Sequence, residues 1–146
     1  EDLVSLVKAF EGGADIVAGH QDGTPEGAPD GMRWTRKLSG LFLRRLVRTA
    51  PVSDPFSGLR AYRVIVLKKA YRDLPEDAFL TTSDGWAANV ELLGKLAAHA
   101  RRIAEAPLSP RFDLRQRPSR FKAFPTFVSL FKLGGSVWSD VPEEVA

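Results

Sequence analysis

The stretch DPFSGLRAYR, residues 54–63, predicts a tight polar turn that leads into a short strand. Pro55 fixes its own φ and biases Asp54 away from the helical region, so a turn begins here. Gly58, which follows Ser57, allows a close approach of another backbone or a positive φ. Beyond the turn, the predicted strand carries small and apolar side chains that can pack and arginines that offer positive charge.

This stretch has two interpretations. A polar turn that carries Asp, Ser, Gly and Arg beside a buried strand can hold a phosphorylated ligand, because such side chains and the free backbone amides bind phosphate oxygens. An ordinary β-turn before an edge strand explains the same residues equally well. Other segments of the chain favour the first interpretation.

Four further segments appear in the same order as in a known family. The motif D-P-x-S-G-x-R is accompanied by GADIVAG at 13–19, RKLS at 36–39, NVELL at 89–93 and RIAEAPL at 102–108. Together these segments, which cover roughly residues 2–121, resemble family-2 glycosyltransferases of the dolichyl-phosphate (polyprenyl-phosphate) mannosyltransferase type. One segment departs from that family, which usually has G-S-R where this chain has Gly19-His20-Gln21. The phosphate role of that arginine is therefore not carried over, and His20 reads most simply as a solvated loop histidine.

The resemblance implies an α/β fold: the C-terminal half of a GT-A-like mixed sheet flanked by helices, with a C-terminal amphipathic helix. Residues 1–120 would form the acceptor-side part of the enzyme and residues 121–146 an amphipathic, membrane-interfacial segment and tail. The implied reaction moves a mannose- or glucose-type sugar from a nucleotide sugar to a polyprenyl phosphate, with inversion, at the cytoplasmic face of the membrane. The nucleotide-binding strands and a D-x-D motif for Mg²⁺ or Mn²⁺ are expected before Glu1, so this chain is expected to supply no metal ligand and to be inactive alone.

The resemblance also implies a set of site residues. Asp54 and Glu91 match positions near the reacting groups and are the catalytic candidates. A guanidinium suits the phosphate because it gives paired, charge-fixed hydrogen bonds to phosphate oxygens. The candidates for phosphate or substrate binding are Arg36, Ser39, Ser57, Gly58, Arg60, Arg115, Ser119 and Arg120.

Glu91 allows two interpretations at this stage. It can form a surface pair with Lys95 at i, i+4, worth a few tenths of a kcal/mol. Alternatively it lies near the acceptor site, where its carboxylate would orient a loop or a cationic partner. A catalytic base is less necessary, because a phosphate acceptor is already ionised at neutral pH.

Composition excludes several other classes of protein. The 146 residues suffice for one ordinary domain, with 44% hydrophobic and 27% charged residues. Because the chain has no cysteine, it has no disulfide frame, thiolate nucleophile or cysteine-ligated zinc. G-x-S-x-G, Walker and HExxH motifs are also missing from the sequence.

The net charge of +3 is unevenly placed, with basic clusters in 33–48 and 111–122. Such clusters suit phosphates, anionic headgroups or nucleic acid. The alternative function is therefore a non-catalytic basic module that binds anionic membrane or nucleic acid, whereas the enzyme would not be expected to bind nucleic acid. A D-x-D motif upstream of Glu1 would favour the enzyme.

Periodicity and turn residues predict the elements. The phenylalanine-rich segment 121–133 fits either a core helix or a helix in a bilayer interface, and the flanking basic residues favour the interface. The predicted helices are 2–11, 32–50, 64–71 and 86–100; the predicted strands are 14–18, 102–108 and the one after the turn, with a further possible strand at 78–82.

Overall fold

The computed structural model describes residues 2–20, 52–75, 79–83, 85–108 and 123–133. The elements in these ranges are α1 (Asp2–Glu11), β1 (Ile16–His20), β2 (Arg60–Tyr62), α3 (Val64–Asp73), α4 (Gly85–Ala97), β3 (Ile103–Pro107) and α5 (Ala123–Leu133). The predicted helix 32–50 lies outside the described residues.

The three strands form one mixed sheet in the order β2-β1-β3. β1 runs antiparallel to β2, with Ala18 opposite Arg60, and parallel to β3, with Ala18 opposite Glu105. β1 is buried up to Gly19, and it is parallel to its neighbour on one side only. A mixed sheet with flanking helices confirms the α/β class.

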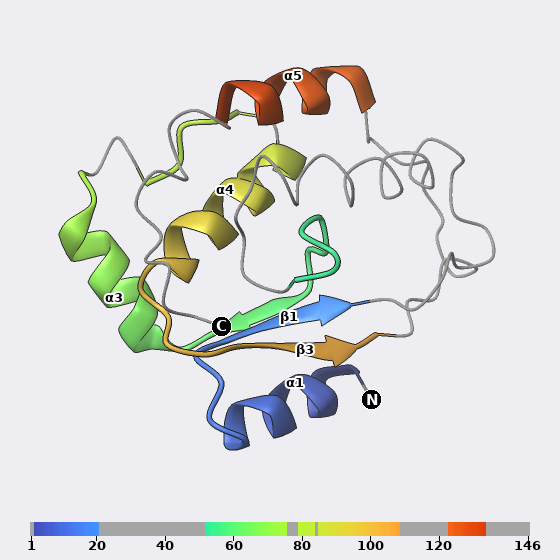
Figure 1. Ribbon diagram of the computed structural model, residues 1–146, viewed down its shortest axis with the longest axis vertical. Helices are drawn as coiled ribbons and strands as arrows, with labels where there is room; N and C mark the ends of the chain where they lie inside the picture. The colour runs from blue at the N-terminus through green and yellow to red at the C-terminus, as the bar shows by residue number, and fades with distance from the viewer. Residues whose placement is uncertain (1, 21–51, 76–78, 84, 109–122, 134–146) are drawn as a thin grey trace.

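Helices cover both faces of this sheet (Figure 1). α1 lies against one face, α3 and α4 lie against the other, and α5 lies beyond α4. The alternation of β1 explains the two layers: Ile16 packs with Leu93 and Leu96 of α4, whereas Val17 packs in the cluster that contains Leu6 of α1. A strand covered on both faces has no polar face, which is why β1 is apolar at every position of its centre.

α1 ends at Glu11, as predicted, and Gly12 and Gly13 follow it. Gly13 has a φ of +90°, which L side chains rarely adopt, and its amide donates to the carbonyl of Phe10 at 2.9 Å. The turn directs the chain back so that β1 pairs beside α1.

Two element predictions are wrong in detail. The described residues 79–82 are not a strand; the backbone amides of Thr81 and Thr82 donate to the side chain of Glu91 instead of to a neighbouring strand. α4 also ends at Ala97, earlier than predicted, and the chain continues in tight turns whose amides, at His99 and Ala100, bond carbonyls three residues back.

α5 is apolar on two sides. Thr126, Leu130 and Leu133 are buried against the rest of the molecule, whereas Phe124 and Phe131 are 80% and 76% exposed. Pro125 is tolerated because it lies in the first turn, where a helical amide has no carbonyl partner.

Candidate functional site

The predicted turn lies where β1 and β3 end. These strands are parallel, so their carboxyl ends share one edge of the sheet. At this edge the amide of Gly19 donates to the carbonyl of Leu59 at 2.9 Å, and the amide of Leu108 donates to the carbonyl of His20 at 2.7 Å. The turn that precedes Leu59 is therefore at the carboxyl edge, where open α/β sheets generally bind their ligands.

The turn is stabilised by its own polar groups. The Oδ1 atom of Asp54 accepts the amide of Phe56 at 3.1 Å, and the carbonyl of Asp54 accepts the amide of Ser57 at 3.2 Å. Both polar residues are buried, with 8% exposure for Asp54 and 9% for Ser57. Asp54 thus closes a local turn through its side chain, a role that the residue type at a turn start favours.

Arg60 connects the turn to α4. Its guanidinium donates from one terminal nitrogen to the carbonyl of Pro55 and from the other to the carbonyl of Asn89. The Nε atom is buried and has no hydrogen-bond partner among the described residues, and none of the described carboxylates forms an ion pair with the guanidinium. The candidate phosphate ligand therefore has both terminal nitrogens engaged by protein carbonyls.

A residue that sequence reasoning missed holds the other end of the turn. The Oε1 atom of Glu105, on β3, accepts the backbone amide of Ser53 at 2.5 Å and its hydroxyl at 2.7 Å. A signal was present in the sequence: Glu105 interrupts the strand I-A-E-A-P on the side that also carries Ile103, a core residue. A carboxylate on the core-facing side of a short strand needs donors, and these come from Ser53.

Gly58 differs from its prediction. Its φ is outside the left-handed region, and a Cβ placed on it would meet nothing within 4 Å. Neither a positive φ nor a close backbone approach explains this glycine. At Gly19, by contrast, a Cβ would lie 2.3 Å from Cδ1 of Leu108 and 2.7 Å from the carbonyl oxygen of Leu59, so the close approach at this edge occurs there.

Glu91 is not the surface residue that its pair with Lys95 suggested. The pair exists, but Glu91 is fully buried and its ammonium partner is 10% exposed. Its carboxylate also accepts the amide and hydroxyl of Thr81, at 2.8 and 2.6 Å, and the amide of Thr82 at 3.0 Å. Glu91 therefore orients the loop before α4, whereas its place near an acceptor site stays a prediction.

These contacts decide the protonation of Glu91. Burial by itself would raise the pKa of the carboxyl, but the hydrogen bonds from Lys95, Thr81 and Thr82 outweigh it, so the pKa lies below its ordinary value. The group is a carboxylate at neutral pH with its donors supplied by the protein.

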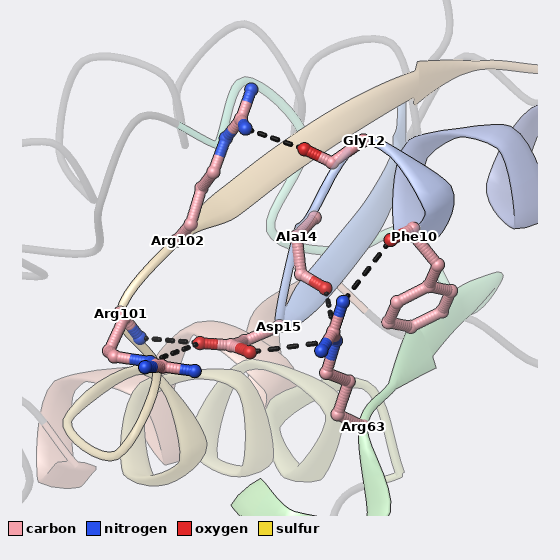
Figure 2. A network of polar contacts seen from close by, with 7 residues as sticks. All are labelled: Phe10, Gly12, Ala14, Asp15, Arg63, Arg101 and Arg102. Atoms are coloured by element: carbon pink, nitrogen blue, oxygen red, sulfur yellow. Dashed lines mark hydrogen bonds and ion pairs between the residues drawn. The ribbon is translucent and has the colours of Figure 1, made fainter.

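A second polar network lies at the opposite end of the sheet, before β1 (Figure 2). Asp15 is 4% exposed, and its carboxylate lies 3.6 Å from Nε of Arg63 and 3.6 Å from Nε of Arg101, whose amide donates to it at 2.9 Å. Arg63 also donates to the carbonyls of Ala14 and Phe10, at 2.8 and 3.2 Å. The network joins the end of α1 to the starts of β1 and β3, so it is structural and separate from the turn.

Burial opposes ionisation of Asp15 as well. It would raise the pKa of the carboxyl, but the amide of Arg101 and the charges of Arg101 and Arg63 lower the pKa below its ordinary value. Asp15 is thus ionised in the folded protein at neutral pH.

The remaining candidate residues lie outside the described residues: Arg36, Ser39, Arg115, Ser119 and Arg120. The described chain on either side of them can be located. The segment with Arg36 follows His20 and precedes Val52, and the segment with Arg115 follows Leu108. His20 and Leu108 are hydrogen-bonded neighbours at the carboxyl edge. The described chain before each basic segment, at His20 and at Leu108, therefore ends at the edge where the turn lies.

Among the described residues, no group of at least three His, Cys, Asp or Glu side chains is placed to hold a metal ion. Within the same ranges, no helix has the length and apolar character to cross a bilayer. In comparisons with known proteins, no family model, curated protein or solved structure matches this chain at a significant level.

Proposed function

We propose that this chain is the acceptor-side part of an inverting family-2 glycosyltransferase with a GT-A-like fold. The reaction transfers a mannose- or glucose-type sugar from a nucleotide sugar to a polyprenyl phosphate at the cytoplasmic membrane face. The observation that supports it best is the position of the D-P-F-S-G turn at the carboxyl edge of β1 and β3, where open α/β sheets generally bind their ligands.

The chemistry requires little from this chain beyond binding. An oxygen of the acceptor phosphate attacks the anomeric carbon, a carbon–oxygen bond to the phosphate forms, and the bond to the nucleotide diphosphate breaks. Arg36, Arg115 and Arg120 would bind the phosphate and orient it for in-line attack. The ionised phosphate needs no base, so Asp54 and Glu91 would support the site by holding the turn and the loop before α4.

A divalent ion, Mg²⁺ or Mn²⁺, is part of the proposed enzyme. The described residues do not fit it. The buried carboxylates of Asp15 and Glu91 already accept hydrogen bonds from or pair with arginine, lysine, threonine and backbone amides, and no described cluster offers three ligands. We therefore assign it no ligand in the described residues and derive no step through it.

The exposed face of α5 supports contact with an anionic membrane surface. Phe124, Val128 and Phe131 recur at i, i+4 and i+7 on the side away from the buried leucines, and Lys132 is exposed beside them. This observation also favours the alternative, a non-catalytic basic membrane-binding module. The alternative explains α5 but leaves the arrangement of the turn without a purpose.

A transfer assay separates the two functions. The protein expressed from its whole gene is incubated with Mg²⁺, a short polyprenyl phosphate and each of several labelled nucleotide sugars. Lipid-linked label with at least one donor is the expected result. Vesicle binding without transfer from any donor would contradict the enzyme and leave the membrane module.

Gly58 offers a sharper variant for the same assay. Because a Cβ there meets no atom of the described residues within 4 Å, Gly58→Val should fold normally, yet its side chain would occupy space beside the turn. We expect a rise of about tenfold in KM for the polyprenyl phosphate, about 1.4 kcal/mol, because the added side chain would obstruct the open side of the turn. The control is Arg72→Ala, an exposed arginine on α3 that pairs with Asp73. An unchanged KM in Gly58→Val would place the acceptor elsewhere.

A further inference from the structure

The residues opposite Ala18 on the two neighbouring strands both form hydrogen bonds with the turn. Arg60 on β2 and Glu105 on β3 flank Ala18 on the same side of the sheet, the side that faces α4. Arg60 reaches the carbonyl of Pro55, and Glu105 reaches the amide and hydroxyl of Ser53. The two outer strands thus bind the turn at positions two residues apart, over a central residue with a small side chain.

The two contacts with the turn differ in how much they contribute to folding. Arg60 is part-buried, and it also bonds Asn89 on α4, so its loss would disturb packing between the sheet and α4. The hydrogen bonds to Glu105 come from Ser53, which is exposed. Water could accept hydrogen bonds from the amide and the hydroxyl of Ser53 equally well. Hydrogen bonds that water can replace add little to global stability. The effect of Glu105 is therefore on where the turn lies more than on whether the chain folds.

We propose that Glu105 is a positioning residue for the site at the carboxyl edge. It fixes Ser53, and with Arg60 it fixes the path of residues 53–58, so that the open side of the turn at Gly58 is held ready for a phosphate-bearing ligand. This inference rests on the proposed function for the identity of the ligand, but the contact between Glu105 and Ser53 does not depend on that function.

The first test measures, without any ligand, how strongly Glu105 restrains the turn. In the 146-residue chain, amide hydrogen exchange is followed at Ser53 and Phe56, with Leu6 and Val17 as internal references. In Glu105→Ala, exchange at Ser53 and Phe56 should accelerate about tenfold or more, while the references change less than about twofold, because a bond to a charged acceptor is lost locally. Glu105→Gln keeps an acceptor oxygen and should restore most of the protection. Equal exchange at Ser53 in the wild type and in Glu105→Ala would overturn the proposal.

The second test asks whether the restraint of the turn by Glu105 is needed for binding of the acceptor. In the protein from the whole gene, Glu105→Ala should raise KM for polyprenyl phosphate about tenfold with kcat within about threefold, and Glu105→Gln should recover it. A loss of Tm that accounts for the activity loss, with no recovery by Gln, would reduce Glu105 to a structural residue. If wild-type protein transfers no sugar, the proposed function fails. The exchange experiment still shows whether Glu105 restrains the turn.

Discussion

The carboxylate of Glu91 accepts both the amide and the hydroxyl of Thr81, at 2.8 and 2.6 Å, from a fully buried position on α4. The same carboxylate pairs with Lys95, one turn further along the helix. A single buried group therefore fixes the loop before α4 and neutralises a nearly buried ammonium.

Removing this group should be costly. Glu91→Ala removes a buried carboxylate that pairs with Lys95 and accepts the amide and hydroxyl of Thr81, so we expect a loss of about 3 kcal/mol or more in the free energy of unfolding. Urea denaturation measures it. Glu11→Ala, at the exposed end of α1, is the control and should change stability by less than about 0.5 kcal/mol. A loss below about 1 kcal/mol in Glu91→Ala would mean that water replaces the lysine and threonine contacts.

Stability should fall in acid. Asp15 and Glu91 have pKa values in the folded protein below the ordinary values of 3.8 and 4.5, so the unfolded chain binds protons first as pH decreases. Their contribution is present above the ordinary pKa values and is lost as the pH falls through the lower, folded values. Urea midpoints between pH 7 and pH 3 should show this decrease.

Asp15→Asn tests the origin of the decrease. The variant should be less stable at pH 7 and should lose less stability on acidification, because one linked carboxylate is gone. Glu11→Gln, which removes an exposed carboxylate at the end of α1, is the matched control. An identical slope in wild type and Asp15→Asn would show that Arg63 and Arg101 do not stabilise the ionised form.

Two glycines should respond oppositely to alanine. At Gly19 the new Cβ would lie 2.7 Å from a backbone oxygen, so we expect destabilisation by about 1–3 kcal/mol. At Gly58 the Cβ has open space and an ordinary φ, so Gly58→Ala should be neutral or more stable by up to about 1 kcal/mol. Thermal unfolding of the pair measures the contrast, and equal Tm values would refute the close contact at Gly19.

The exposed rings of α5 should be needed for membrane binding. In flotation with vesicles that contain anionic lipid, Phe124→Asp and Phe131→Asp together should reduce the bound fraction about tenfold or more, because two apolar side chains no longer enter the interface. Tyr71→Asp, at an exposed aromatic on α3, is the matched control and should bind like the wild type. Undiminished binding by the double variant would assign the membrane contact to another surface.

Local signals predicted most of the described elements. The spacing of Leu3, Leu6 and Phe10 with the following glycines predicted α1, and Asp54-Pro55 predicted the turn before β2, because helix periodicity and turn chemistry act over a few neighbouring residues. The resemblance implied the α/β class, and the mixed sheet with its flanking helices confirms it. The function predicted from the resemblance, its ligands and its location remain proposals.

Tertiary structure decided what each polar group does. Glu105 meets Ser53 across 52 positions of sequence, and Asp15 meets the amide of Arg101 across 86. Helix spacing identified the pair of Glu91 and Lys95 but placed it at the surface, since nothing within one helix tells which face α5 and the loop before α4 will cover. The sequence by itself determined where most of the described helices, strands and turns form, because those depend mainly on neighbours along the chain. The packing of α4 against the sheet and the register of β3 decided which charges are buried and which donors meet them, because these depend on partners that sequence spacing does not identify.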